Sequence, residues 1–106
     1  MPKYLFQGSY IGDGLKGLLK EGGSKRVEAA KHLFESLGGK LESFYFAFGE
    51  DDIFVVFELP DQVSAIAVSL VINASGAAKG KVTVLLTPEE LDQASKKSVS
   101  YRPPGQ

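Results

Sequence analysis

One segment, Leu41 to Pro60 (LESFYFAFGEDDIFVVFELP), constrains the fold more than any other part of this 106-residue chain. The whole chain has eleven aromatic residues, seven phenylalanines and four tyrosines, and this segment holds six of them. Only Gly49-Glu50-Asp51-Asp52 separates its two apolar runs, and this is typical of a turn, so we predict a β-hairpin. Large apolar side chains alternate onto both faces of that hairpin, and so short a chain has too few helices to cover both. We therefore expect a second copy of the chain to cover the other face.

Outside the hairpin, the chain alternates between strand and helix patterns. Strands are predicted over residues 4–10, 41–48, 53–59 and 81–86, where aromatic and β-branched residues gather. Helices are predicted over residues 24–37, over 61–74, and from Thr87 to Lys96-Lys97. The glycines within residues 13–23 allow only a short helical turn there.

Capping signals predict where these helices begin and end. Ser24 and Asp61 are the expected N-caps, and Gly38-Gly39 is the expected stop of the first long helix. Thr87-Pro88-Glu89-Glu90 is the strongest local signal, because a threonine cap, an early proline and a glutamate three residues after the cap form a capping box.

The order of elements, β-α-β-β-α-β followed by a terminal helix, predicts an α+β protein. This is the ferredoxin-like split βαβ arrangement, with a four-stranded antiparallel sheet and two helices on one face. We expect one domain over residues 1–98 and an extended, proline-rich tail over residues 99–106.

The register of the hairpin separates its two faces. A turn of two or four residues centred on Glu50-Asp51 pairs Phe48 with Ile53, Phe46 with Val55, Phe44 with Phe57 and Glu42 with Leu59, and this face packs against the helices. The open face then carries Leu41, Ser43, Tyr45, Ala47, Asp52, Phe54, Val56 and Glu58. If Tyr4 and Phe6 face the helices, the first strand adds Leu5, Gln7 and Ser9 to the open face, and if Val82 and Val84 do, the fourth adds Lys81, Thr83 and Leu85.

Such a mixed face predicts self-association and a binding site. Monomers rarely expose an apolar surface of this size, so we expect a homodimer or higher oligomer through the open sheet face. Its polar groups are expected to line a small-molecule cavity between the sheets, with Gln7, Ser9, Ser43, Tyr45, Phe54 and Glu58 as the binding residues.

Catalytic candidates are few. Glu58 with Tyr45 is the best pair, because an inward carboxylate has a raised pKa unless Lys81 or Arg102 reaches it; an interface ion pair is the alternative role for Glu58. His32 is the only histidine and is predicted to face solvent. Glu50-Asp51-Asp52 is interpreted as a polar turn without the spacing of a calcium loop, and we predict no metal or other cofactor.

Composition narrows the class of protein. With 12 basic and 13 acidic residues the net charge is -1, so no nucleic-acid partner is expected. There is no cysteine, and no apolar run long enough to span a bilayer. The first residues lack the apolar stretch of a secretory signal, so we expect a soluble cytoplasmic protein with no membrane partner.

Several segments together resemble the GYD domain family of small bacterial and archaeal proteins. They are the Gly49–Asp52 hairpin with Pro60-Asp61 after it, the Leu86–Glu90 segment and the Tyr101–Gly105 ending. The resemblance implies a dimeric α/β barrel of ferredoxin-like fold, and it implies no particular activity. The tripeptide that names the family falls at the hairpin, where this chain has Asp51 in place of tyrosine, so no role of that tyrosine is expected here.

Three classes of function fit these features. We favour a non-catalytic, small-molecule-binding or assembly module, since it needs only the mixed open face. The alternative is a cofactor-independent dimeric-barrel enzyme of the monooxygenase or isomerase type, which needs an inward base. A purely structural interaction protein is expected if the two sheets pack without a cavity.

Overall fold

The computed structural model describes residues 1–106 as an α+β protein. The elements are β1 (Lys3–Tyr10), α1 (Asp13–Glu21), α2 (Gly23–Ser36), β2 (Lys40–Phe46), β3 (Ile53–Glu58), α3 (Gln62–Ala74), β4 (Ala78–Leu85) and α4 (Pro88–Ser95). The strands form one antiparallel sheet in the order β2-β3-β1-β4. This is the strand order of the ferredoxin-like fold, so the predicted class is confirmed.

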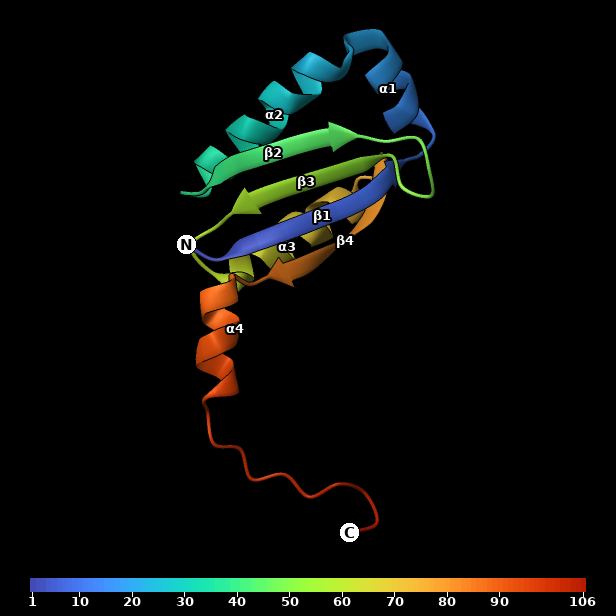
Figure 1. Cartoon of the computed structure of the whole chain (residues 1–106). Coiled ribbons are helices and arrows are strands. Elements are labelled where there is room, and N and C mark those ends of the chain that lie inside the picture. The colour runs from blue at the N-terminus through green and yellow to red at the C-terminus, as the bar shows by residue number, and fades with distance from the viewer.

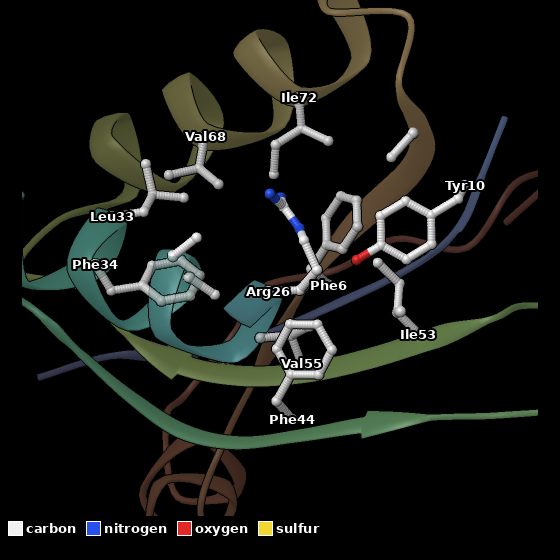
Figure 2. Close-up of a pocket in the computed structure, with 13 residues that line it drawn as sticks. Phe6, Tyr10, Arg26, Leu33, Phe34, Phe44, Ile53, Val55, Val68 and Ile72 are labelled. Carbon is white, nitrogen blue, oxygen red and sulfur yellow. The ribbon is translucent and has the colours of Figure 1, made fainter. Parts of the chain in front are cut away.

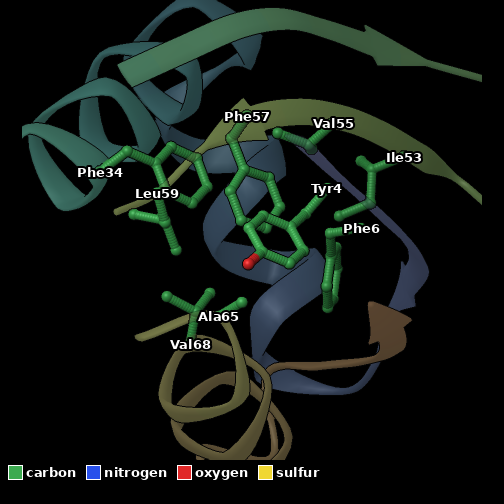
Figure 3. Close-up of a cluster of buried hydrophobic side chains, with 9 residues drawn as sticks. All are labelled: Tyr4, Phe6, Phe34, Ile53, Val55, Phe57, Leu59, Ala65 and Val68. Atoms are coloured by element: carbon green, nitrogen blue, oxygen red, sulfur yellow. The ribbon is translucent and has the colours of Figure 1, made fainter. Parts of the chain in front are cut away.

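Helices α2 and α3 cover one face of the sheet, as Figure 1 shows, and the other face has no helix over it. Between the covered face and the helices lies the core (Figure 3), formed by Tyr4, Phe6, Phe34, Ile53, Val55, Phe57, Leu59, Ala65 and Val68. Phe57 at its centre has no exposed surface. Its ring stacks on Phe34 at 4.3 Å and on Tyr4 at 5.6 Å between ring centroids, so the two central strands and α2 meet in one aromatic stack.

The glycine-rich stretch after β1 forms more helix than predicted. In place of a short turn, α1 runs for nine residues, and α2 follows directly at Gly23. Ser24 therefore lies inside α2 and not at its N-cap, which is Gly22 with a φ of 86°. Gly14 shows why glycine is needed, because a Cβ there would lie 1.9 Å from the Ala77 carbonyl oxygen. Helix propensity alone could not predict that α1 packs so closely against the residue before β4.

The hairpin register differs from the prediction by two residues. Phe46 pairs with Ile53, and Phe44 pairs with Val55, while a β-bulge at Glu42 brings Leu41 opposite Phe57. The shift of two residues keeps Phe44 and Phe46 on the helix side as predicted and leaves Phe48 in the loop, while the bulge moves Leu41 from the predicted open face to the core.

Contacts to β1 explain this register. The Asp52 N–H donates to the Gly8 carbonyl at 2.8 Å, and the Tyr10 N–H donates to Asp52 Oδ2 at 3.2 Å. The Ala47 N–H closes the loop by donating to the Asp52 carbonyl at 2.7 Å. The turn is therefore held by β1, which is distant in sequence. The register could not be predicted from the hairpin sequence alone.

Strand β4 begins at Ala78, three residues before the predicted start at Lys81. Gly80, which lies just before the predicted strand, pairs with Gly8 inside the sheet. The side-chain amide of Asn73 both donates to the Gly80 carbonyl and accepts its N–H, each at 3.1 Å. These two hydrogen bonds join α3 to the edge strand β4. They stabilise the strand at Gly80, where there is no side chain to pack.

The C-terminal region projects away from the sheet (Figure 1). Thr87 and Glu90 form the predicted capping box, with Glu90 N–H donating to Thr87 Oγ1 at 3.1 Å and Thr87 N–H donating to Glu90 Oε1 at 3.0 Å. The radius of gyration is 16.8 Å, whereas a compact domain of this size has about 13 Å. None of the four helices has the length and apolar character that crossing a bilayer requires.

Two phenylalanines of the same hairpin provide a matched test of the core. Replacing the fully buried Phe57 with alanine is expected to lower the free energy of unfolding by about 3–5 kcal/mol, because a cavity opens in the aromatic stack. Phe48→Ala, at a fully exposed loop position, is expected to change it by less than about 0.5 kcal/mol. Urea denaturation followed by circular dichroism at one protein concentration checks both, and equal losses would contradict the assigned register.

The cap of α3 gives a pH-dependent prediction. Asp61 Oδ1 accepts the Ser64 N–H at 2.7 Å, and this backbone hydrogen bond, with one from the Ser64 side chain, lowers the pKa of Asp61 below its ordinary value of 3.8. A carboxyl with a lowered folded pKa stabilises the protein above pH 3.8 and loses that contribution as the pH falls through the folded value. Asp61→Asn keeps an acceptor that does not titrate. The urea midpoint of wild type is therefore expected to fall more between about pH 6 and about pH 2 than that of Asp61→Asn, and equal falls would contradict the assignment.

Candidate functional site

All six predicted binding residues lie on the open face of the sheet. The register forms rows across it in the order β2, β3, β1, β4, one reading Ser43, Val56, Leu5, Thr83 and the next reading Tyr45, Phe54, Gln7, Lys81. Ser9 lies near one end of these rows and Glu58 at the other. Period-two alternation predicted this grouping correctly, because the two-residue register shift leaves Ser43, Tyr45, Phe54 and Glu58 on their predicted face.

The middle of the open face is apolar but not fully exposed. Leu5, Phe54 and Val56 are half-buried by their neighbours in the sheet, while Tyr45 is 69% exposed at the edge strand. The face therefore combines an apolar centre with hydroxyl and amide groups around it, which is the composition of a binding surface rather than of a solvated one.

One end of the open face carries four linked charges. Lys40 Nζ lies 3.3 Å from Glu58 Oε2, and Lys3 Nζ donates to Glu42 Oε1 at 2.9 Å. The hydrogen bond and charge of Glu42 raise the pKa of Lys3, with a smaller contribution from Glu58. The bulge matters here, because it turns Glu42 toward Lys3 across the neighbouring strand.

Glu58 has a different partner from the one predicted. Lys40 pairs with it, whereas Lys81 lies in another row opposite Gln7, and Arg102 lies in the projecting tail. The Glu58 side chain is only 13% exposed, so the pair is well shielded on one side. Because Tyr45 pairs with Phe54, four residues before Glu58 along β3, about 13 Å separates the two along the strand. The structure does not bring the predicted catalytic pair together.

The acidic hairpin tip holds the loop in place. Asp51 Oδ2 accepts a hydrogen bond from Gln7 Nε2 at 3.1 Å, and Asp52 accepts the Tyr10 N–H. Ser9 Oγ is 3.5 Å from the Glu50 carbonyl oxygen. The carboxylates of Asp51 and Asp52 therefore accept from two different residues of β1, as in a polar turn. No group of three acidic or histidine side chains converges on one point. His32 is exposed on α2, as predicted.

A cavity on the opposite side of the sheet escaped prediction. It has a volume of about 260 Å³ between α2 and α3 (Figure 2), and twelve of its thirteen lining residues are hydrophobic. Arg26 of α2 is the single charged residue among them. The sequence contains one indication of this cavity, because the small residues Ala29 and Ala30 follow Arg26 at helical spacing and lie beside it.

A second cavity lies under α1. It has a volume of about 410 Å³ and is lined by Tyr10, Leu15, Leu18, Gly23, Phe46, Ala47, Phe48 and Asp52. The only carboxylate in it, that of Asp52, already accepts the Tyr10 N–H. The glycine-rich connection thus forms a helical cover over the hairpin end of the sheet.

Comparison with protein families gives one match. The GYD domain model matches residues 4–95, which include all four strands and all four helices except Lys3 at the start of β1. Neither the curated proteins nor the solved structures include a significant match. Because this family model covers most of the chain, from the first strand to the end of α4, the protein belongs to the GYD domain family.

Proposed function

We propose that this protein is a self-associating module in which two copies pack their open sheet faces together and enclose a small-molecule site. The observation that carries the proposal is the apolar centre of the open face, where Leu5, Phe54 and Val56 have no covering element in their own chain. Burial of such a surface by a second sheet is favourable at about 25 cal/mol per Å² of apolar area.

The charges on this face suit a two-fold partner. Glu50 and Asp51 lie at the hairpin tip, and Lys79 and Lys81 lie on β4 at the same end of the sheet. A two-fold axis parallel to the strands brings the hairpin corner of one copy over the β4 corner of the other. Opposite charges then face each other at both corners, which favours this pairing over random contact.

The projecting C-terminal arm, residues 86–106, also supports self-association. Leu86, Leu91, Val99 and Tyr101 are exposed along it. The arm begins directly after Leu85, which pairs with Lys3 and belongs to the open face. In a face-to-face pair the arm therefore starts at the rim of the interface, within reach of the partner.

Polar residues among the apolar ones favour a cavity over a dry interface. Ser43 and Gln7 lie beside Val56 and Phe54 in the rows of the face, and short polar side chains leave space where two flat sheets meet. The proposed ligand contacts are Gln7, Ser9, Ser43, Tyr45, Phe54 and Glu58. The Lys40 pairing of Glu58 and its distance from Tyr45 favour ligand binding over acid-base catalysis at this site.

Sedimentation equilibrium tests the assembly. Wild type is expected to be a dimer at micromolar concentration, and Val56→Glu is expected to be monomeric because it places a charge in the centre of the interface. Leu19→Glu is the matched control, since Leu19 is exposed on α1, away from the open face, and its dimer is expected to persist. Circular dichroism confirms that each variant is folded. A wild-type monomer, or a dimer unaffected by Val56→Glu, rules out this interface.

Thermal-shift screening against a panel of small metabolites tests the ligand site. A compound that raises the melting temperature of wild type is expected to lose most of that effect in Tyr45→Phe or Glu58→Gln, because each removes a polar group from the proposed cavity. The dimer should persist in both variants. If both variants keep the full shift, the ligand does not bind between the sheets.

A further inference from the structure

The cavity between α2 and α3 has the form of a second ligand site. Phe6, Phe44, Ile53 and Val55 of the sheet form its floor, while Leu33 of α2 and Val68 and Ile72 of α3 form its walls (Figure 2). The space has a volume of about 260 Å³ and is partly open to solvent, so a small molecule can enter it and contact the core residues at its floor. Ala30 contributes to this space, because it is half-buried against the core and a larger side chain there would extend into the cavity.

Arg26 brings a positive charge into this apolar space. In Figure 2 its side chain rises from α2 toward Ile72, with the guanidinium inside the ring of lining residues. Its nearest acidic partner is Glu21, at 3.7 Å between Nη1 and Oε2, which is longer than a hydrogen bond. This ion pair is the only charged contact of Arg26, whose side chain is 41% exposed and donates no hydrogen bond, so its donors can bind an anion at the cavity in competition with Glu21.

Tyr10 adds a second polar group. Its ring lines the same cavity, and Figure 2 shows the hydroxyl directed toward the middle of the space. The backbone N–H of Tyr10 donates to Asp52 Oδ2 at 3.2 Å, which anchors the backbone of this residue at the end of β1. One guanidinium and one hydroxyl facing an apolar chamber are complementary to a group with a single negative charge and two acceptor oxygens.

We propose that this cavity binds a small amphipathic monocarboxylate, with its apolar body between α2 and α3 and its carboxylate at Arg26. At about 30 Å³ per heavy atom, the volume that a water molecule takes up in the liquid, the cavity holds a ligand of roughly nine non-hydrogen atoms. Hexanoate and benzoate have this size and chemistry. A phosphate ester fits less well, because Arg26 is the single cation among the lining residues.

This site is separate from the proposed site on the open face. The two lie on opposite sides of the sheet, and the rows that form the open face share no residue with the cavity lining. Face-to-face dimerisation therefore leaves the cavity between α2 and α3 accessible, and its ligand does not depend on dimerisation.

Titration of the full-length protein with hexanoate and benzoate, followed by amide NMR shifts and by calorimetry, tests the proposal. Saturable shifts are expected at the amides of Arg26, Ala30 and Ile72. Hexanol and benzyl alcohol, which lack the charge, are expected to bind more weakly. Arg26→Met keeps the apolar stem of the side chain and is expected to weaken carboxylate binding about 10- to 100-fold, as loss of a charged hydrogen bond does.

Two further variants complete the experiment. Ala30→Leu fills the cavity and is expected to abolish binding; if it fails to fold, Arg26→Met alone decides the question. Tyr45→Phe, on the open face, should bind hexanoate as wild type does. The proposal is overturned if neither carboxylate gives saturable shifts, if the alcohols bind equally well, or if Arg26→Met leaves the affinity unchanged.

Discussion

The aromatic stack of Tyr4, Phe57 and Phe34 is the interaction on which the rest of the structure depends. It joins β1, β3 and α2, and Phe57 at its centre is completely buried. Because side chains alternate along a strand, placing Tyr4 and Phe57 in the core sends Leu5, Val56 and Glu58 to the other face. The core thereby decides the composition of the open face, and the two chemically different sides of the sheet follow from one packing constraint.

Small residues decide where elements approach one another. Gly8 and Gly80 pair across β1 and β4, and Gly14 lets α1 pass close to Ala77. Ala30 has the opposite effect, because its small side chain contributes to an open space between α2 and α3 instead of a close contact. The same property, absence of a large side chain, therefore produces tight backbone packing at one end of the molecule and a cavity at its side.

The surroundings of Glu58 in the structure differ from those that its sequence position suggests. An inward carboxylate on an apolar face suggests an acid or a base when the sequence is considered alone. In the structure, Lys40 accompanies it, and the bulge at Glu42 adds a second pair through Lys3, so the end of the sheet carries a line of alternating charges. A carboxylate paired in this way is suited to binding a ligand and not to acid-base catalysis. On the other side of the sheet, Arg26 is the single charged residue among those that line the cavity between α2 and α3.

The sequence by itself determined the elements whose causes are local. Period-two alternation identified the core and open faces of β1 and β3, and the Asp61 and Thr87 caps placed α3 and α4, since these signals act within a few residues. Only the tertiary structure decided the hairpin register, because Gly8 and Tyr10 hold Asp52 from more than forty residues away. The length of α1 and the cavity beside Arg26 were likewise beyond prediction, since both depend on how close two separately folded elements come, and that distance is set by the packing of the whole domain.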